Sequence, residues 1–422
     1  MYDIFSLKDY SFPKDFLFGS GYAGHQVEGN NTNTQYWIDE VAGKKSEASG
    51  LACNSYEMYR DDIQLVSDLG HKAFRTSIEW SRIQPDPDTF DKEAADHYIR
   101  LFAELKENGI KTFCTIIHFT TPLWFTDKGG LNNADNRIYF EKYLEYIVPK
   151  VAPYVDFWNV LNEFNIMNQP NPIPPLLFHA LGYRIIKKYS DKPVSTAHAL
   201  IEYIPQRKYD KLDNLMCEYR DFCEHEFFFH AIRTGEVIFP RTDGFYDADV
   251  KGSCDFWSIN LYSRTMQDGR KERRKGKVWD HKHLPMIDYE NFFLEEFFPE
   301  GVIDVLTRLT DKPVYISENG VACKDDRFRI VWIATYLSAL SEAIKLGIDV
   351  RGYLHWTLLD NYEWASYTPT FGLCEVDRTG DFKRTPKPSA YFYRDIIKNN
   401  GFNQEILRKY LTSMPSLDPT IK

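Results

Sequence analysis

Eight short apolar segments alternate with helix-like stretches along the whole 422-residue chain, and this alternation is the strongest constraint on its fold. Each segment is rich in β-branched and aromatic residues, which is typical of a buried β-strand. No low-complexity linker divides the chain into halves. The expected strands are residues 16–22, 72–78, 111–118, 157–162, 193–200, 256–262, 313–318 and 351–356.

The stretches between these segments have the apolar periodicity of amphipathic helices. The clearest expected helices are residues 56–69, 92–108, 137–151 and 329–346, and three of them are followed at once by a glycine, a common signal for a helix C-terminus. Strand and helix repeated eight times predict an α/β fold, a single (β/α)8 TIM barrel over residues 1–422. A doubly wound sheet is the alternative, but the glycines of FGSGYAG lack the GxGxxG spacing of its dinucleotide-binding form.

Charge and cysteine usage exclude several classes of partner. A formal net charge of -10 disfavours nucleic acid and anionic membranes, and the basic run RKERRKGK at residues 270–277 is interpreted as a solvated loop. The seven cysteines form no CxxC pair or metal-ligand spacing, so we expect reduced thiols, a cytoplasmic protein, and neither a metal nor an organic cofactor. No signal peptide and no run of eighteen apolar residues is found, so neither secretion by that route nor a membrane span is expected.

Polar and aromatic residues gather where the expected strands end, which is where a (β/α)8 barrel carries its active site. Amides, carboxylates, an imidazole and indoles suit an uncharged polyol better than a phosphate or a metal ion. Arg75 and Asn260 are equally consistent with the satisfaction of buried polar groups. The candidates are Gln26, Arg75, His118, Asn162, Glu163, Asn260, Tyr262, Glu318, Trp356, Glu363 and Trp364.

Two of these candidates, Glu163 and Glu318, end the apolar runs FWNVLNEF and PVYISENG. A single glutamate after a strand is equally consistent with a solvated loop residue or a helix N-cap. The expected strands 4 and 7, however, lie nearly opposite each other in an eight-stranded ring, so the two side chains can converge over its mouth. Cleavage of a glycosidic bond needs one acid and one carboxylate in this arrangement.

Several ordered motifs resemble the β-glucosidase-like enzymes of glycoside hydrolase family 1. They are FLFGSGYAGHQVEG, KAFRTSIEWSRI, the NE of FWNVLNEF, SINLY, ISENG and GYLHWTLLDNYEW, and the resemblance extends to RTPKPS near residue 389. The resemblance implies a retaining β-glycosidase with Glu318 as nucleophile and Glu163 as acid and then base. In such enzymes the two carboxyl groups lie roughly 5 to 5.5 Å apart, and the charge of the nucleophile favours a protonated acid.

The same resemblance implies roles for the other candidates. Arg75, Asn260 and Tyr262 would support the nucleophile, and Asn162 would bind the 2-hydroxyl of the sugar. Trp356 would supply a stacking face. The remaining hydroxyls would be bound by Gln26, His118, Glu363 and Trp364.

The chain departs from the family pattern around Glu163 and after His118. Val160 and Phe164 stand where the acid motif usually has threonine and proline, and Phe119 stands where a tryptophan commonly follows the histidine. The connection between the expected strands 4 and 5 is short for the family, with the proline-rich stretch 169–175 in place of a longer excursion, which suggests a more open leaving-group side. Residues 365–373 contain no lysine or arginine, so a neutral rather than a 6-phosphorylated sugar is expected.

Two alternatives remain open on the sequence alone. A transglycosylase would use the same covalent intermediate, and a catalytically silent relative would bind a β-glycoside without cleaving it. The preferred sugar, the linkage and the oligomeric state are not readable from these residues.

Overall fold

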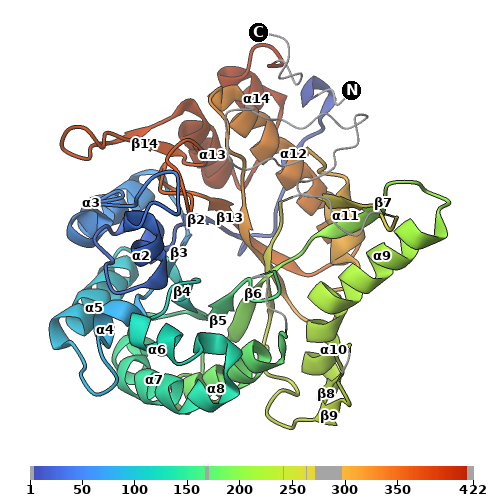
Figure 1. The fold of residues 1–422 in the computed structure, drawn as a ribbon. Coiled ribbons are helices and arrows are strands. Elements are labelled where there is room, and N and C mark those ends of the chain that lie inside the picture. The colour runs from blue at the N-terminus through green and yellow to red at the C-terminus, as the bar shows by residue number, and fades with distance from the viewer. Residues whose placement is uncertain (1–3, 167–170, 241, 263, 271–296, 416–422) are drawn as a thin grey trace.

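A computed structural model describes residues 4–166, 171–240, 242–262, 264–270 and 297–415 (Figure 1). Two features discussed above lie partly outside these residues. Gln169 and Pro170 of the proline-rich stretch are not described, and of the basic run only Arg270 is.

Eight parallel strands close into a barrel, which confirms the predicted fold. Neighbouring strands of the ring follow one another along the chain, and the ring closes where β13 pairs with β2 through Gly352 and Leu17. Observed and predicted strands agree to within about two residues at each end. The strands are β2 (Leu17–Gly21), β3 (Ala73–Ser77), β4 (Lys111–Ile117), β5 (Phe157–Asn162), β6 (Val194–Ala199), β10 (Trp257–Asn260), β12 (Val314–Asn319) and β13 (Val350–Trp356).

Aromatic side chains fill the amino-terminal end of the barrel. Phe113 stacks on Phe157 with ring centroids 4.3 Å apart, and Tyr315 lies 5.0 Å from Phe157 and 5.3 Å from Phe256. All four come from the first residues of their strands or just before them. The interior is therefore packed at this end, and space for a ligand is left at the carboxyl ends of the strands.

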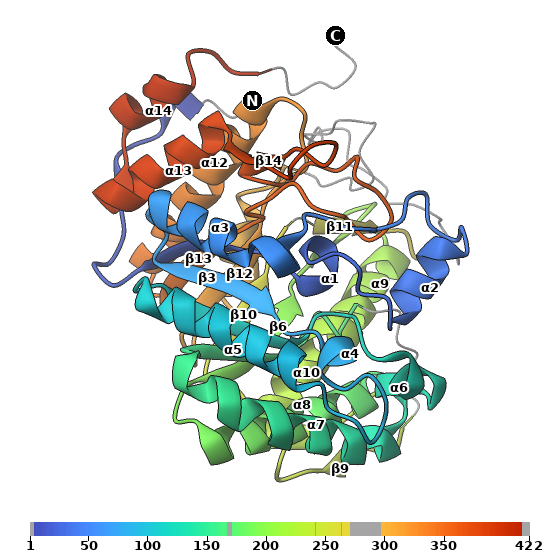
Figure 2. The ribbon, with the colours of Figure 1, turned by 90° about the vertical axis from the view of Figure 1, so that its left-hand side faces the viewer.

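Helices cover the outside of the barrel, and the four predicted ones are confirmed (Figures 1 and 2). They are α3 (Ser55–Asp68), α5 (Lys92–Glu107), α7 (Arg137–Val151) and α12 (Asp326–Lys345). Gly109 and Gly347 have φ of 73° and 95°, the left-handed conformation that glycine adopts after a helix. Helix α12 begins three residues earlier than predicted, because the side chain of Asp325 caps it by accepting from the Arg327 amide.

Further helices complete the outer layer and its excursions, and α13 and α14 pack beside α12 (Figure 1). These are α1 (Gly24–Val27), α2 (Gln35–Val41), α4 (Trp80–Ile83), α6 (Leu123–Asp127), α8 (Ile173–Tyr189), α9 (Lys211–Asp221), a π-helix (Phe222–Glu226), α10 (Phe227–Thr234), α11 (Gly301–Leu306), α13 (Pro388–Asn399) and α14 (Gln404–Tyr410). The 3-10 helices are Ile4–Ser6, Gly130–Asn132, Ala134–Asn136 and Ala152–Tyr154.

Four small two-stranded sheets lie outside the barrel. One of them, β7 with β11, is parallel and follows the ends of β6 and β10. The pairs are β1 (Tyr10–Ser11) with β16 (Gly401–Phe402), β7 (Glu202–Pro205) with β11 (Arg264–Gln267), β8 (Glu236–Val237) with β9 (Phe245–Tyr246), and β14 (Cys374–Val376) with β15 (Arg384–Pro386).

All seven cysteines are free thiols, as predicted, and all but Cys223 are buried. Within the described ranges, no helix has the length and apolar character that a membrane crossing requires.

Candidate active site

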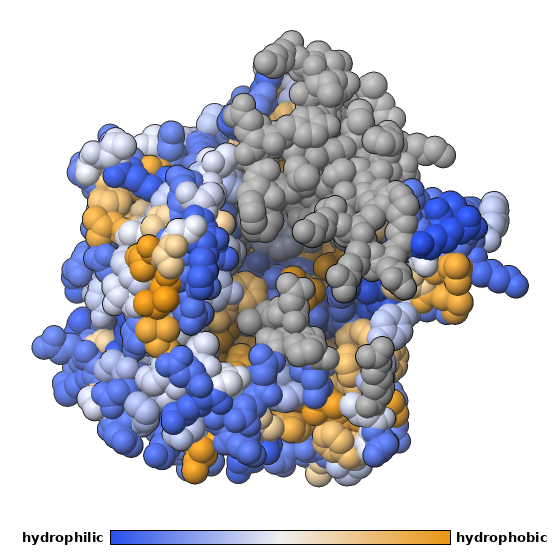
Figure 3. All heavy atoms as spheres, viewed as in Figure 1, coloured by the Kyte–Doolittle hydropathy of each residue, from blue (hydrophilic) through white to orange (hydrophobic). Residues whose placement is uncertain are grey.

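A cavity of 610 Å³ opens at the carboxyl ends of the barrel strands. The face seen in Figure 1 is hollowed at its centre, with hydrophobic side chains on the walls (Figure 3). Nine of the eleven candidate residues line this cavity, whereas Gln26 and Arg75 lie fully buried behind it. The nine are His118, Asn162, Glu163, Asn260, Tyr262, Glu318, Trp356, Glu363 and Trp364.

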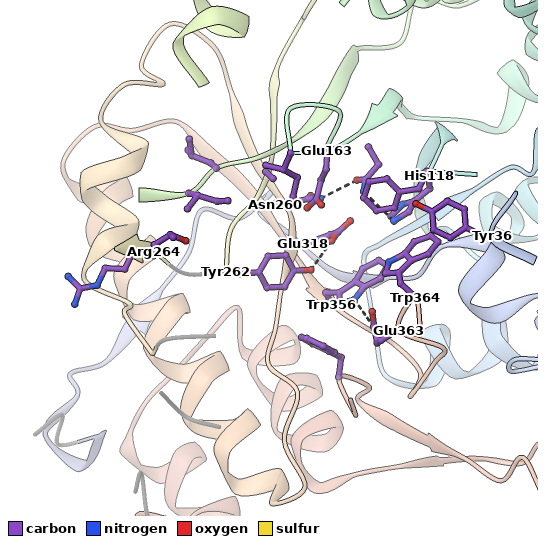
Figure 4. A pocket seen from close by; sticks show the side chains of 18 of the residues that line it. Tyr36, His118, Glu163, Asn260, Tyr262, Arg264, Glu318, Trp356, Glu363 and Trp364 are labelled. Atoms are coloured by element: carbon purple, nitrogen blue, oxygen red, sulfur yellow. Dashed lines mark hydrogen bonds between the residues drawn. The ribbon is translucent and has the colours of Figure 1, made fainter. Parts of the chain in front are cut away.

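The two glutamates reach the cavity from opposite parts of the ring. Glu163 directly follows β5 and Glu318 lies near the end of β12, and both carboxylates point into the same space (Figure 4). The strand pairing changes register next to Asn162, Asn260 and Glu318. Such irregularities bend a strand locally and re-aim its side chains, which is why they are common beside active sites.

Both oxygens of Glu318 are held by donors from other strands. Arg75 of β3 forms an ion pair with Oε1, and the Tyr262 hydroxyl donates to Oε2 at 2.7 Å. The second amino group of Arg75 donates to Asn162 Oδ1 at 2.6 Å. Burial and the charge of Glu318 raise the pKa of Tyr262 well above its usual value, so its hydroxyl stays protonated and remains a donor.

Glu163 is held by Asn260, which differs from the role expected for that asparagine. The Asn260 amide donates to Glu163 Oε1 at 2.8 Å and to Asn162 Oδ1 at 3.1 Å, and its own oxygen accepts from the Ser317 hydroxyl at 2.7 Å. The family resemblance implied that Asn260 supports Glu318. The described hydrogen bonds place it beside Glu163 instead, because the register change at the end of β10 turns its amide toward β5.

His118 has one free donor position toward the cavity. Burial and the charge of Arg75 lower the pKa of His118 well below its usual value, so the ring is neutral. Asn162 Nδ2 lies 3.2 Å from His118 Nε2, which makes Nε2 the acceptor and leaves the proton on Nδ1. This Nδ1 has no partner among the described residues, so it can donate to a ligand hydroxyl.

Glu363 lies deep in the cavity wall between two donors. Gln26 Nε2 donates to its Oε2 at 2.9 Å, and Trp356 Nε1 donates to Oε1 at 3.2 Å. Burial, assisted by the charge of Glu318, raises the pKa of Glu363 to about 8. The Glu363 carboxyl group therefore holds its proton more tightly than an exposed glutamate does, and in its protonated form it can both donate to and accept from a hydroxyl.

Aromatic rings form the other walls. The His118 ring lies nearly parallel to those of Trp356 and Trp364, with centroids 5.7 Å and 5.9 Å away. Phe119 meets Trp364 edge-on at 5.0 Å, so the residue that replaces the family's usual tryptophan contributes packing and no donor. Flat indole faces beside polar groups suit the C–H faces and hydroxyls of a sugar.

Several lining residues were not predicted; most come from loops or from strand β11 outside the barrel, whereas Ala199 and Leu200 lie at the end of β6. Tyr36 of α2 packs on Trp364 with centroids 5.0 Å apart, and the Lys45 ammonium lies 5.8 Å from the Tyr36 ring. Nothing in their local sequence distinguishes them from surface loop residues. The others missed are Ile166, Ala199, Leu200, Ile201, Arg264, Thr265 and Phe371.

The described residues contain no group of three or more histidine, cysteine or acidic side chains that could hold a metal ion. The cavity presents the carboxyl groups of Glu163, Glu318 and Glu363, fixed hydrogen-bond donors and aromatic walls.

The chain is similar to known proteins over nearly its whole length. The family model "Glycosyl hydrolase family 1" matches residues 8–199 and 176–402. A β-galactosidase of Saccharolobus solfataricus is 30% identical, with 97% of this chain and 99% of that protein covered. β-Glucosidase A of Acetivibrio thermocellus is 29% identical, with 93% and 99% covered.

Solved structures of similar proteins have the same fold. A β-glycosidase from Pyrococcus horikoshii superposes with a TM-score of 0.85 at 31% identity, covering 97% of this chain and all of that one. The family 1 β-glucosidase of Thermotoga maritima superposes with a TM-score of 0.83 at 25% identity, covering 93% and 99%.

Proposed function

The chain belongs to glycosyl hydrolase family 1 and is a glycoside hydrolase of the β-glucosidase and β-galactosidase type, and we propose that it cleaves unphosphorylated β-glycosides with retention of configuration. One observation carries this proposal. A continuous hydrogen-bonded network joins Glu163 to Glu318 across the cavity through Asn260, Asn162 and Arg75. Two carboxyl groups held across one sugar-sized cavity are what a double displacement needs.

In the first step, Glu318 attacks the anomeric carbon and Glu163 protonates the glycosidic oxygen as the bond to the leaving group breaks. The product is a glycosyl ester on Glu318 and a free alcohol. In the second step, Glu163 takes a proton from water, the water oxygen bonds to the anomeric carbon, and Glu318 departs as a carboxylate. Esterification removes the charge of Glu318, which lowers the proton affinity of Glu163 at the moment it must act as a base.

The remaining side chains bind and orient the sugar. Arg75 and Tyr262 orient Glu318 and balance its charge, and Asn162, placed beside both glutamates, is positioned for the 2-hydroxyl. The Nδ1 of His118, the unpartnered oxygen of Gln26 and the carboxyl group of Glu363 are the polar groups left for the other hydroxyls. Trp356 and Trp364 supply the apolar faces. No cofactor has a part in these steps.

A reducing compartment such as the cytoplasm is part of the proposal. It is supported by the seven free cysteines, six of them buried and none paired.

The test is covalent trapping with 2,4-dinitrophenyl 2-deoxy-2-fluoro-β-glucoside, followed by intact-protein mass and peptide mapping. Fluorine at C2 slows hydrolysis of the intermediate more than its formation, so one sugar should accumulate on Glu318. The matched control is Glu318→Gln, which should stay unlabelled. A label on another residue would overturn the assignment, and the absence of label with both the gluco- and galacto-configured reagents would favour a silent sugar-binding protein.

A hydrolase and a transglycosylase form the same labelled species, so product analysis must follow. Turnover in the presence of glycerol should release free sugar as the main product. If glyceryl glycoside were the main product, the protein would be a transglycosylase rather than a hydrolase.

A further inference from the structure

The turn that carries Glu163 out of β5 has an unfavourable backbone conformation. Glu163 has φ of 49°, in the left-handed region that non-glycine residues seldom adopt. Its amide donates to the Ala197 carbonyl at 2.7 Å, and its carbonyl accepts from the Ile166 amide at 3.1 Å. A residue in this region persists only where its surroundings hold it there.

The side chain of Asn165 supplies such a hold. Its Nδ2 donates to the carbonyl of Ala199 at 2.8 Å, and its Oδ1 accepts from the amide of the same residue at 3.2 Å. One side-chain amide therefore pairs with both backbone groups of the last residue of β6, as a neighbouring strand would. The clamp joins the end of β5 to the end of β6 beyond the point where their own pairing stops at Asn162 and Ala197.

A buried histidine pair fixes the segment that Asn165 grips. His225 Nε2 lies 2.9 Å from the Ile201 carbonyl and 3.2 Å from the Ile201 amide, and its Nδ1 lies 3.0 Å from His198 Nε2. His198 belongs to β6, and His225 belongs to the π-helix Phe222–Glu226. Residues 198–201 are thereby tied to the outer helical layer. A π-helix turn inserted in a helix is often retained at a functional site.

Packing of Phe164, the residue before Asn165, also limits movement of the turn. Phe164 is buried and meets the ring of Phe228 on α10 at a centroid distance of 5.5 Å. The Phe228 ring in turn stacks on His198 at 5.1 Å. Residues on both sides of the turn are thus anchored to β6 and α10.

We propose that Asn165 is the positioning residue of the acid/base Glu163, acting by clamping the 163–166 turn to Ala199. The inference rests on the proposed function of Glu163. Proton transfer to the leaving oxygen requires hydrogen-bond geometry, and a misplacement of about 1 Å can cost about a hundredfold in rate. Asn165 itself does not line the cavity, so it acts only through Glu163.

The experiment compares Asn165→Ala with Asn214→Ala on aryl β-glycosides whose leaving groups range from phenol to 2,4-dinitrophenol. Asn214 is a matched control: it is also half-buried, and its Nδ2 donates to the Lys208 and Asp210 carbonyls at 3.1 Å and 2.7 Å, on α9 outside the cavity lining. A poor leaving group needs the proton from Glu163, whereas 2,4-dinitrophenolate leaves without it. Selective loss on poor leaving groups is therefore not produced by general destabilisation.

For Asn165→Ala we expect kcat/KM on the phenyl glycoside to fall by about tenfold or more, and on the dinitrophenyl glycoside by about twofold or less, because general acid catalysis contributes about 100- to 10,000-fold. Added azide should restore kcat on the dinitrophenyl glycoside, since it needs no base in the second step. Asn214→Ala should leave kcat/KM unchanged on both the phenyl and the dinitrophenyl glycoside. Equal losses on all leaving groups, or no loss, would overturn the proposal.

Two further variants keep the test decisive. Asn165→Asp has the same size and keeps the acceptor, but it sets a second oxygen against the Ala199 carbonyl, so it should show the same selective loss even if the alanine variant folds poorly. Glu163→Ala separates the two proposals. If Glu163→Ala loses activity selectively on poor leaving groups and neither Asn165 variant does, the positioning role fails alone; if Glu163→Ala shows no selectivity, the proposed function of Glu163 fails.

Discussion

Glu163 accepts a 2.8 Å hydrogen bond from the amide of Asn260, which lies at the end of β10 and not on the strand of Glu163 itself. The same Nδ2 donates to Asn162 Oδ1, which also accepts from Arg75, the ion-pair partner of Glu318. A displacement of one glutamate is therefore transmitted to groups that hold the other. The predictions below probe individual connections of this network.

Arg75 balances the charge of Glu318, and its side chain is fully buried. We expect Arg75→Met to lower the free energy of unfolding by about 3–5 kcal/mol, as removal of one partner of a buried ion pair does, and to reduce kcat/KM by far more than the loss of folded protein explains. The matched control is Arg384→Met, which breaks the buried 2.8 Å pair with Asp62 outside the cavity. Urea unfolding and aryl glycosidase rates measure both effects; equal activity per folded molecule in the two variants would contradict the role of Arg75.

Tyr262 donates to Glu318 Oε2, so Tyr262→Phe removes one hydrogen bond to a charged group without changing the shape of the cavity. Such a bond contributes about 1.5–3 kcal/mol, so kcat/KM should fall about 10- to 100-fold. Tyr98→Phe is the control, because Tyr98 likewise donates to a carboxylate, Glu28, at 2.9 Å, but is fully buried outside the cavity lining. Its activity should stay near that of the unmodified protein, and an equal fall in both variants would show that only folding had been affected.

The pKa of Glu363 is raised from 4.5 to about 8, so the folded protein holds this proton more tightly than the unfolded chain does. The resulting stability is fully present below about pH 4.5 and is lost as the pH rises through about 8. We expect the urea midpoint of Glu363→Gln to decline less between about pH 5 and pH 9 than that of the unmodified protein. Burial also raises the pKa of Glu28, to about 7. Glu28 is present in both proteins, so part of the decline of the urea midpoint with pH should remain in each.

The control for this pH experiment is Glu57→Gln, which changes an exposed carboxylate of α3. It should show the same pH slope as the unmodified protein. If Glu363→Gln also shows that slope, then Glu363 titrates near its ordinary value.

A 6-phosphorylated sugar should be a poor substrate. The ionised carboxylate of Glu318 faces the cavity, and the loop after β13 offers no lysine or arginine between residues 365 and 373. We expect kcat/KM for a 6-phosphoglycoside to be at least about tenfold below that for its unphosphorylated form, since about 1.4 kcal/mol of unfavourable charge is enough. Lys45 is the cation on the wall beside Tyr36 and Trp364, so a reversed preference that Lys45→Ala abolishes would show that Lys45 holds the phosphate.

The barrel could be predicted because its signals are local. Each strand is a short apolar run, and the two glutamates and most of the sugar-facing candidates lie at or just after strand ends, where an α/β barrel carries its active site. The family motifs then carried the assignment of Glu163 and Glu318. Tyr36 and Lys45 could not be found in the same way, because a loop residue reaches the cavity only through the path that the whole loop takes.

Hydrophobic periodicity and chain order were enough to predict the strand order and the end of the barrel that carries the cavity, and the family motifs predicted Glu163 and Glu318 as its acidic groups. The tertiary structure determines which side chains form hydrogen bonds and ion pairs with these acidic groups. The turn of Asn260 toward Glu163, the fully buried Arg75 behind Glu318, the raised pKa of Glu363 and the clamp of Asn165 on Ala199 all depend on side chains far apart in the chain. Register shifts of one residue and the depth of burial set these contacts, and neither is written in a local stretch of residues.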